Sequence, residues 1–137
     1  MAMMSAELFA PSASVTDGAR REVLLVDHDP VIRLVCRIIL ERRNFRPILA
    51  ESGVEGLYEY QEKCADIAVV IADILDGISI AQEIFRINPH ANVIITTVYD
   101  PPHAMPDELR RRCAVVSKSF AADDLLAAIA HCVQQPA

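Results

Sequence analysis

Apolar residues are distributed along this chain in two alternating patterns. In one, short runs rich in Val, Ile and Leu are apolar at nearly every position, which is typical of strands buried on both faces of a parallel sheet. In the other, apolar residues recur every three or four positions, which indicates a helix with one apolar face. The first pattern predicts strands over residues 23–26, 45–51, 66–73, 92–100 and 113–120.

Helices are predicted between these strands, and the first two have recognisable starts. Asp29 followed by Pro30 is a typical helix start, because the carboxylate can cap the helix and proline fits its first position. Ser52 and Glu55 form the pattern of a capping box, which predicts a second helix to about Lys63. The apolar side chains expected to lie on one face of the first helix are Val31, Leu34, Val35, Ile38 and Ile39.

Three further helices are expected, and together the elements predict a fold class. The third covers residues 77–88, the fourth is short and starts near Pro106 because prolines precede it, and the fifth carries Leu125, Leu126, Ile129 and Val133. Alternating strands and helices form right-handed units with a parallel sheet between two helical layers. We therefore predict a doubly wound α/β domain with five parallel strands. The second strand contains Pro47 and is expected near an edge.

Length and composition limit the classes of protein that fit. The 137 residues are enough for one domain, expected over residues 21–134 after a disordered tail at 1–20. A net charge of −6 argues against direct binding to nucleic acid. The chain has no apolar run of about 18 residues and no signal-peptide pattern, so we expect a cytoplasmic protein that does not contact a membrane. The run Arg110, Arg111 and Arg112 is either a solvated helix end or a docking site for a partner.

Chemically reactive side chains follow the predicted strands at their carboxyl ends. In parallel sheets, ligands bind beyond these ends, so Asp27, His28, Asp73, Thr97 and Lys118 are expected to surround one crevice. Clustered carboxylates repel one another unless a cation such as Mg²⁺ or an ammonium group lies between them. An aspartate beside a lysine and a divalent ion can attack phosphorus. A threonine hydroxyl and a lysine ammonium can then contact the phosphoryl oxygens.

Five motifs in order give the chain a family resemblance. They are "LLVDHDPVIR", "VVIADI", "DGISIAQEI", "VIITTVYD" and "SKSF". With this spacing, residues 21–134 resemble a bacterial response-regulator receiver domain of the CheY-like type. The resemblance implies the strand order 2-1-3-4-5 and a stand-alone receiver in a two-component phosphorelay. Such a protein is a phosphoacceptor in signalling rather than a turnover enzyme.

The resemblance also implies roles for individual residues and partners. Asp73 would accept a phosphoryl group from a sensor histidine kinase or a phosphotransfer protein, and a downstream protein target would read the change. Asp27 and Asp73 would hold Mg²⁺ together with the Leu75 backbone carbonyl. Thr97 and Lys118 would contact the phosphoryl group. Formation of a homodimer is left open.

His28 stands where the family has a second acid. The metal would then have two carboxylates instead of three, and imidazole suits softer ions better than Mg²⁺. We therefore expect Mg²⁺ binding to be weakened or lost. His28 itself either binds a metal, or supplies a charge that responds to pH near neutrality, or is a neutral imidazole bonded to Asp27 or Asp73.

Three other departures from the family pattern concern the surrounding loops and strands. Only Ile74 and Leu75 separate Asp73 from Asp76, so the loop after Asp73 is about four residues short of the family pattern. Ser119 replaces a proline, and Val115 replaces an aromatic residue. The alternative function is therefore a pseudo-receiver, a docking or dimerisation module regulated without phosphorylation, in which the Asp73–Lys118 pair is structural. A small hydrolase with Asp73 as nucleophile is a third, more distant hypothesis.

Overall fold

A five-stranded parallel sheet forms the centre of the domain. The structure is a computed structural model that describes residues 22–98, 105–118 and 122–134, so the predicted tail at 1–20 lies outside the described residues. The strand order β4-β3-β5-β6-β7 is the predicted order 2-1-3-4-5, which confirms the fold class, and β4 lies at an edge as expected. The strands are β3 (Glu22–Val26), β4 (Arg46–Ala50), β5 (Ile67–Asp73), β6 (Val93–Thr97) and β7 (Cys113–Ser117).

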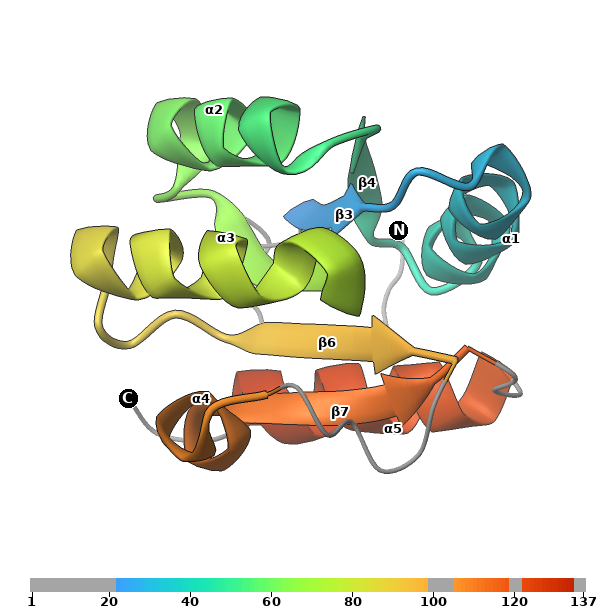
Figure 1. Cartoon of the computed structure of the whole chain (residues 1–137). Helices are drawn as coiled ribbons and strands as arrows, with labels where there is room; N and C mark the ends of the chain where they lie inside the picture. The colour runs from blue at the N-terminus through green and yellow to red at the C-terminus, as the bar shows by residue number, and fades with distance from the viewer. Residues whose placement is uncertain (1–21, 99–104, 119–121, 135–137) are drawn as a thin grey trace.

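Helices cover both faces of this sheet (Figure 1). They are α1 (Pro30–Glu41), α2 (Gly53–Lys63), α3 (Ile74–Ile87), α4 (Asp107–Arg112) and α5 (Ala122–Gln134). Buried side chains of α1 and α5 pack with Val23 and Leu25 on one face. Those of α2, α3 and α4 pack with Leu24 and Val26 on the other. The alternation of strand side chains thus builds two cores, one on each side of the sheet.

The predicted helix starts of α1 and α2 are present. Asp29 Oδ1 accepts a hydrogen bond from Val31 N at 2.8 Å. Ser52 Oγ accepts one from Glu55 N at 3.2 Å. Gly56 lies on the inner side of α2, where a Cβ atom would come within 2.6 Å of Val26 Cγ2. Glycine therefore lets α2 approach the end of β3 closely.

The third helix starts earlier than the sequence pattern predicted. We expected it from Gly77, whereas α3 begins at Ile74, directly after β5. Asp73 is both the last residue of the strand and the N-cap of the helix, and its Oδ2 accepts a hydrogen bond from Leu75 N at 3.1 Å. The Asp73 carboxylate caps the first turn of the helix directly at the end of the strand. The chain therefore passes from strand to helix without an intervening loop.

The apolar face predicted for α1 does not point into the core. Its buried residues are Cys36 and Leu40, and the partly buried Ile32 and Ile39 pack beside them. Of the five residues predicted to form the inner face, only Ile39 belongs to this group. The other four are exposed to solvent: Val31, Leu34, Val35 and Ile38. Since α1 is apolar around most of its circumference, periodicity alone identified an apolar stripe but not the one that packs.

The short helix α4 is attached to α3 through Arg112. The guanidinium of Arg112 lies 3.8 Å from the ring centroid of Phe85, and its Nη2 donates to the Pro89 carbonyl at 2.9 Å. Arg110 Nη2 donates to the Met105 carbonyl at 3.3 Å. Arg112 therefore connects α4 to α3, Arg110 makes a contact within its own segment, and all three arginines remain exposed to solvent.

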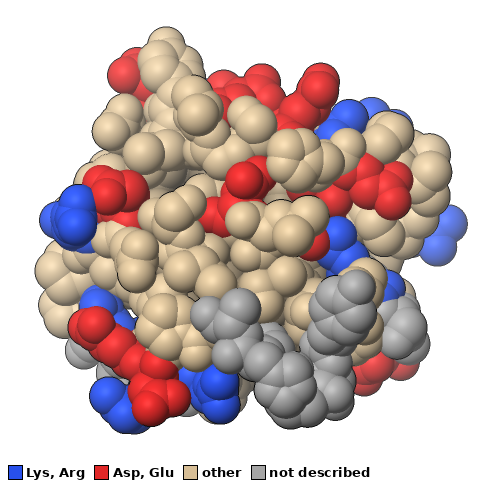
Figure 2. Space-filling view, viewed as in Figure 1, with Lys and Arg blue, Asp and Glu red and all other residues tan. Residues whose placement is uncertain are grey.

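The described part of the chain has an uneven surface charge and no membrane-crossing helix. None of its helices combines the length and the apolar character needed to cross a membrane. Figure 2 shows acidic side chains over α2 and basic side chains at the outer edge of the α1 region.

We predict that Arg112→Ala lowers the free energy of unfolding by about 1 to 2 kcal/mol, because it removes a cation–π contact and a charged hydrogen bond. Urea denaturation measures the change. The matched control Arg111→Ala, at the exposed neighbour, should stay within about 0.5 kcal/mol of the parent chain. Equal losses in the two variants would contradict the role given to Arg112.

Candidate functional site

Lys118 bridges two buried acids at the carboxyl ends of the strands. Its Nζ lies 2.9 Å from Asp27 Oδ2 and 2.6 Å from Asp73 Oδ1. Asp27 is 2% exposed and Asp73 is 5% exposed. Lys118 follows β7, and its backbone N–H donates to the Thr97 carbonyl at 2.7 Å, which fixes the lysine beside β6. The ends of β3, β5 and β7 therefore bring together three of the residues singled out in the sequence.

The charge of this cluster depends on a balance at the lysine. Burial by itself lowers the pKa of Lys118, because it disfavours the charged form. Hydrogen bonds to Asp73 and Asp27, together with the charges of both carboxylates, act in the opposite direction. The net effect is a raised pKa for Lys118, so the ammonium stays protonated between the two acids at neutral pH.

The remaining carboxylate oxygens have different surroundings. Asp27 Oδ1 accepts a hydrogen bond from Asp29 N at 2.8 Å. Asp27 Oδ2 is buried and its partner is the Lys118 ammonium, 2.9 Å away. Both oxygens of Asp73 have partners, Lys118 at Oδ1 and the Leu75 N–H at Oδ2. All four carboxylate oxygens of Asp27 and Asp73 thus have a partner.

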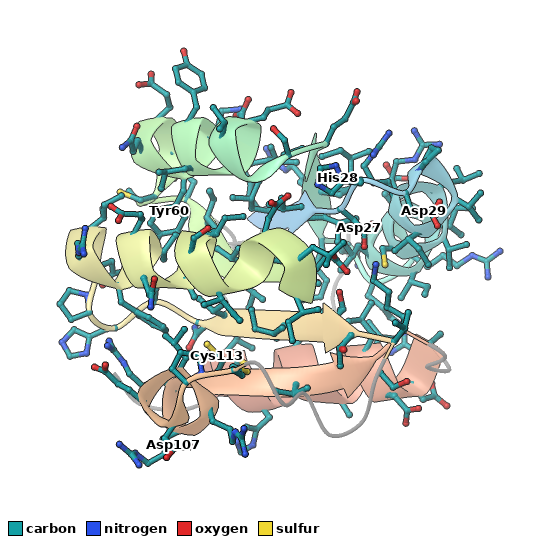
Figure 3. All side chains as sticks on the ribbon, in the orientation of Figure 1. Asp27, His28, Asp29, Tyr60, Asp107 and Cys113 are labelled. Carbon is teal, nitrogen blue, oxygen red and sulfur yellow. The ribbon has the colours of Figure 1, made fainter. Side chains whose placement is uncertain are left out.

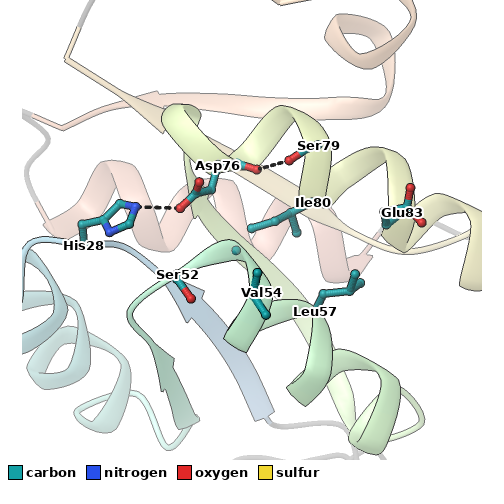
Figure 4. Close-up of a pocket in the computed structure, with 9 residues that line it drawn as sticks. His28, Ser52, Val54, Leu57, Asp76, Ser79, Ile80 and Glu83 are labelled. Carbon is teal, nitrogen blue, oxygen red and sulfur yellow. Dashed lines mark hydrogen bonds and ion pairs between the residues drawn. The ribbon is translucent and has the colours of Figure 1, made fainter.

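His28 pairs with an acid that the sequence had not indicated. Its Nε2 lies 2.7 Å from Asp76 Oδ2, in the first turn of α3 (Figure 4). The expected bond to Asp27 or Asp73 is therefore wrong, because α3 starts early enough to bring Asp76 to the end of β3. Figure 3 shows His28 following Asp27 there, with Asp29 at the start of α1. Asp76 could have been identified only from the short spacing after Asp73.

The other candidate residues surround the cluster less directly. Thr97 is buried at the end of β6. Its neighbour Thr96, which sequence reasoning missed, pairs with Asp73 in the sheet, and its hydroxyl lies 3.5 Å from the Ala72 carbonyl. Leu75 lies in the first turn of α3, where helical carbonyls point along the axis toward the far end of the helix. Val115 is exposed on β7, and Ser119 lies outside the described residues.

The two carboxylates that would hold a metal ion already contact the lysine. Asp27 Oδ2 is a buried acceptor of the type that a hard cation prefers. However, Lys118 already bridges Asp27 and Asp73, while His28 is paired with Asp76. Within residues 22–98, 105–118 and 122–134, no three His, Cys, Asp or Glu side chains are grouped so that they could hold a metal ion. The described residues therefore offer Mg²⁺ two carboxylates, Asp27 and Asp73, both of which contact Lys118.

Comparisons with known proteins decide the family. The model of the response regulator receiver domain matches residues 23–130. The chain belongs to the response-regulator receiver domain family. A receiver domain from Clostridium thermocellum has a similar structure, with a TM-score of 0.76 and 30% identity over 82% of this chain and 94% of that one. The chemotaxis protein CheY of Halobacterium salinarum is 34% identical over 79 residues, which are 56% of this chain and 66% of CheY.

A third similar structure bears on the cofactor of receiver domains. The response regulator TrrA of Thermotoga maritima was solved in complex with Mg²⁺ and BeF. It is 26% identical, with a TM-score of 0.71 over 82% of this chain and 98% of TrrA. Receiver domains generally bind Mg²⁺, accept a phosphoryl group on an aspartate and interact with histidine kinases or phosphotransfer proteins. This receiver domain spans less than half the length of the first curated transcriptional regulators that it matches.

We predict that Lys118→Met destabilises this receiver domain by about 3 kcal/mol, because removing one partner of a buried ion cluster leaves the other charges uncompensated. Urea denaturation at neutral pH measures the loss. The double variant Lys118→Met/Asp73→Asn should recover part of it, since it removes one of the two uncompensated acids. If Lys118→Met is as stable as the parent chain, Lys118 does not have the bridging role.

The same lysine predicts a dependence of stability on alkaline pH. Because its pKa is raised in the folded protein, its contribution is fully present below the ordinary lysine pKa of about 10.4. The contribution is lost as the pH rises through the raised value. The difference in unfolding free energy between the parent chain and Lys118→Met should therefore narrow above about pH 10.5. A difference that stays constant from neutral to strongly alkaline pH would rule out this linkage.

Proposed function

We propose that this receiver domain accepts a phosphoryl group on Asp73 from a histidine kinase or phosphotransfer protein and presents the change to a downstream protein. The observation that supports this proposal best is the Lys118 ammonium, 2.6 Å from Asp73 Oδ1 and also paired with Asp27. Aspartate phosphorylation is general in the family. Asp73 lies at the end of the central strand, and of the two acids it is the one closer to Lys118.

The transfer requires one bond to form and one to break. An Asp73 carboxylate oxygen attacks phosphorus, the P–N bond to the donor histidine breaks, and the imidazole nitrogen keeps the electron pair. Negative charge accumulates on the transferring oxygens, and a fixed ammonium beside them lowers the barrier. Lys118 is held in that position by Asp27 and by its backbone bond to Thr97. Thr97 is proposed as a further contact to the bound phosphoryl group.

We predict that acetyl phosphate with Mg²⁺ adds one phosphoryl group to the parent chain and none to Asp73→Asn, as measured by intact mass. The matched control Asp76→Asn should keep the modification, because Asp76 lies beside the site but contacts His28 rather than Lys118. Modification of Asp73→Asn would place the acceptor elsewhere. No modification of the parent chain with any divalent ion would exclude the proposal.

We also propose that His28 and the bridging lysine make Mg²⁺ binding weaker than in receivers with two adjacent acids. An acid at position 28 would add the missing carboxylate, and oxygen ligands suit Mg²⁺. Addition of Mg²⁺ should therefore raise the melting temperature of His28→Asp more than it raises that of the parent chain. If the two chains respond equally to Mg²⁺, the residue at position 28 does not limit the binding.

A second candidate function is that of a pseudo-receiver, which docks partners without being phosphorylated. The observation that favours it is the direct passage from β5 into α3, in which Asp73 caps the helix and both its oxygens are engaged. Attack on phosphorus would have to weaken one of these contacts. The same mass measurement distinguishes the two functions.

A further inference from the structure

One outer surface of the domain combines exposed apolar and basic side chains. We call it the α1 face: a stripe of Val31, Leu34, Val35 and Ile38, which are 63, 48, 41 and 40% exposed. The positions follow the spacing i, i+3, i+4 and i+7, so they form one continuous ridge. Residues 33–46 contain five arginines and a single acid, of which Arg37 lies in α1, Arg42 caps its end and Arg43 follows. Arg33 is used inside the domain, where its Nη1 donates to the Asp27 carbonyl at 2.7 Å. The α1 face is therefore an apolar ridge with basic side chains near its C-terminal end.

A second surface has a hollow and the opposite charge. We call it the α2–α3 groove: a cavity of about 280 Å³ with Val54, Leu57 and Ile80 among its lining residues (Figure 4). Asp76 and Glu83 line it as well. A neighbouring hollow adds Glu51, Glu55 and Tyr58. Val54 is 83% exposed, so the apolar part of the groove is accessible to a partner.

The charges on the two surfaces are complementary. Residues 51–62 contain four glutamates and neither lysine nor arginine, in contrast to the arginine-rich residues 33–46. Glu59 pairs with Lys63 and Glu83 pairs with Arg86, so Glu51 and Glu55 carry most of the negative charge that a partner would meet at the groove. The helices that carry the surfaces lie on opposite faces of the sheet. One molecule can therefore offer both surfaces at once, each to a different neighbour.

We propose that the α1 face of one copy of this chain packs against the α2–α3 groove of a second copy. The apolar ridge would cover the exposed Val54, and the exposed Arg42, one helical turn after Ile38 at the C-cap of α1, would meet the glutamates of the groove. Pairing of two α1 faces is disfavoured, because it would bring the same arginines together. Because the two surfaces differ, the association is head-to-tail and can extend beyond a dimer. It does not depend on phosphorylation of Asp73.

The proposed contact is small and depends on charge. Four partly exposed side chains and one short helix bury less than the roughly 800 Å² per partner of a stable interface, so we expect a dissociation constant in the micromolar range or weaker. The association should weaken as the salt concentration rises, because exposed charge pairs are screened.

Sedimentation equilibrium from about 1 µM to about 300 µM tests the proposal, since a weak interface becomes populated in this range. We predict that the weight-average mass of the full chain rises with concentration. Leu34→Glu on the α1 face and Val54→Arg in the groove should each stay monomeric. An equimolar mixture of the two variants should associate again, because each retains the surface that the other lacks.

Three controls make the outcome decisive. Val133→Glu changes an exposed apolar residue of α5 outside both surfaces and should associate like the parent chain. Asp73→Asn should also associate normally. If Leu34→Glu or Val54→Arg has an altered melting temperature, Val31→Glu and Tyr58→Arg are used in their place. A parent chain that stays monomeric, or a mixture that stays monomeric while the parent chain associates, would overturn the proposal.

Discussion

The burial of two carboxylates against one ammonium group is the constraint on which the site depends. Asp27 and Asp73 end adjacent strands of a parallel sheet and are almost completely shielded from water. Without compensation, this burial would cost several kcal/mol. Lys118 supplies the compensation from a strand that is far away in sequence, and its backbone is tied to β6. The positions of three strand ends are thus linked through a single side chain.

The absence of a loop between β5 and α3 gives the site its particular form. Asp73 has to serve as strand end, lysine partner and helix cap at the same time. The first turn of α3 is consequently close enough to the end of β3 for Asp76 to pair with His28. In this arrangement the histidine connects the end of β3 to α3, and its partner is Asp76 instead of one of the two buried acids. The short connection and the histidine are therefore parts of one local rearrangement.

The surface of the domain is as distinctive as its site. On one side of the sheet, α1 exposes an apolar ridge that ends beside Arg42, and on the other side α2 and α3 surround a hollow lined in part by acids. Exposed apolar side chains in a continuous stripe are uncommon on monomeric proteins and mark contact surfaces. The attachment of α4 to α3 through Arg112 and Phe85 adds a well-held short helix to the groove side of the sheet.

The sequence by itself determined the order of the elements and most of the cluster. Apolar periods are local signals, so they identified five strands and the helix starts at Asp29 and Ser52. The parallel arrangement then required the strand ends to meet, which brought Asp27, Asp73 and Lys118 together.

Only the tertiary structure decided the partner of His28 and the packed side of α1. The partner of His28 depends on where α3 begins. The Asp73 carboxylate sets that start, because it caps the helix from the end of β5. The second depends on how α1 lies over β3 and β4, because a helix that is apolar around most of its circumference offers two ridges of similar character. Local periodicity cannot choose between such ridges, since the choice is made by contacts with segments distant in sequence.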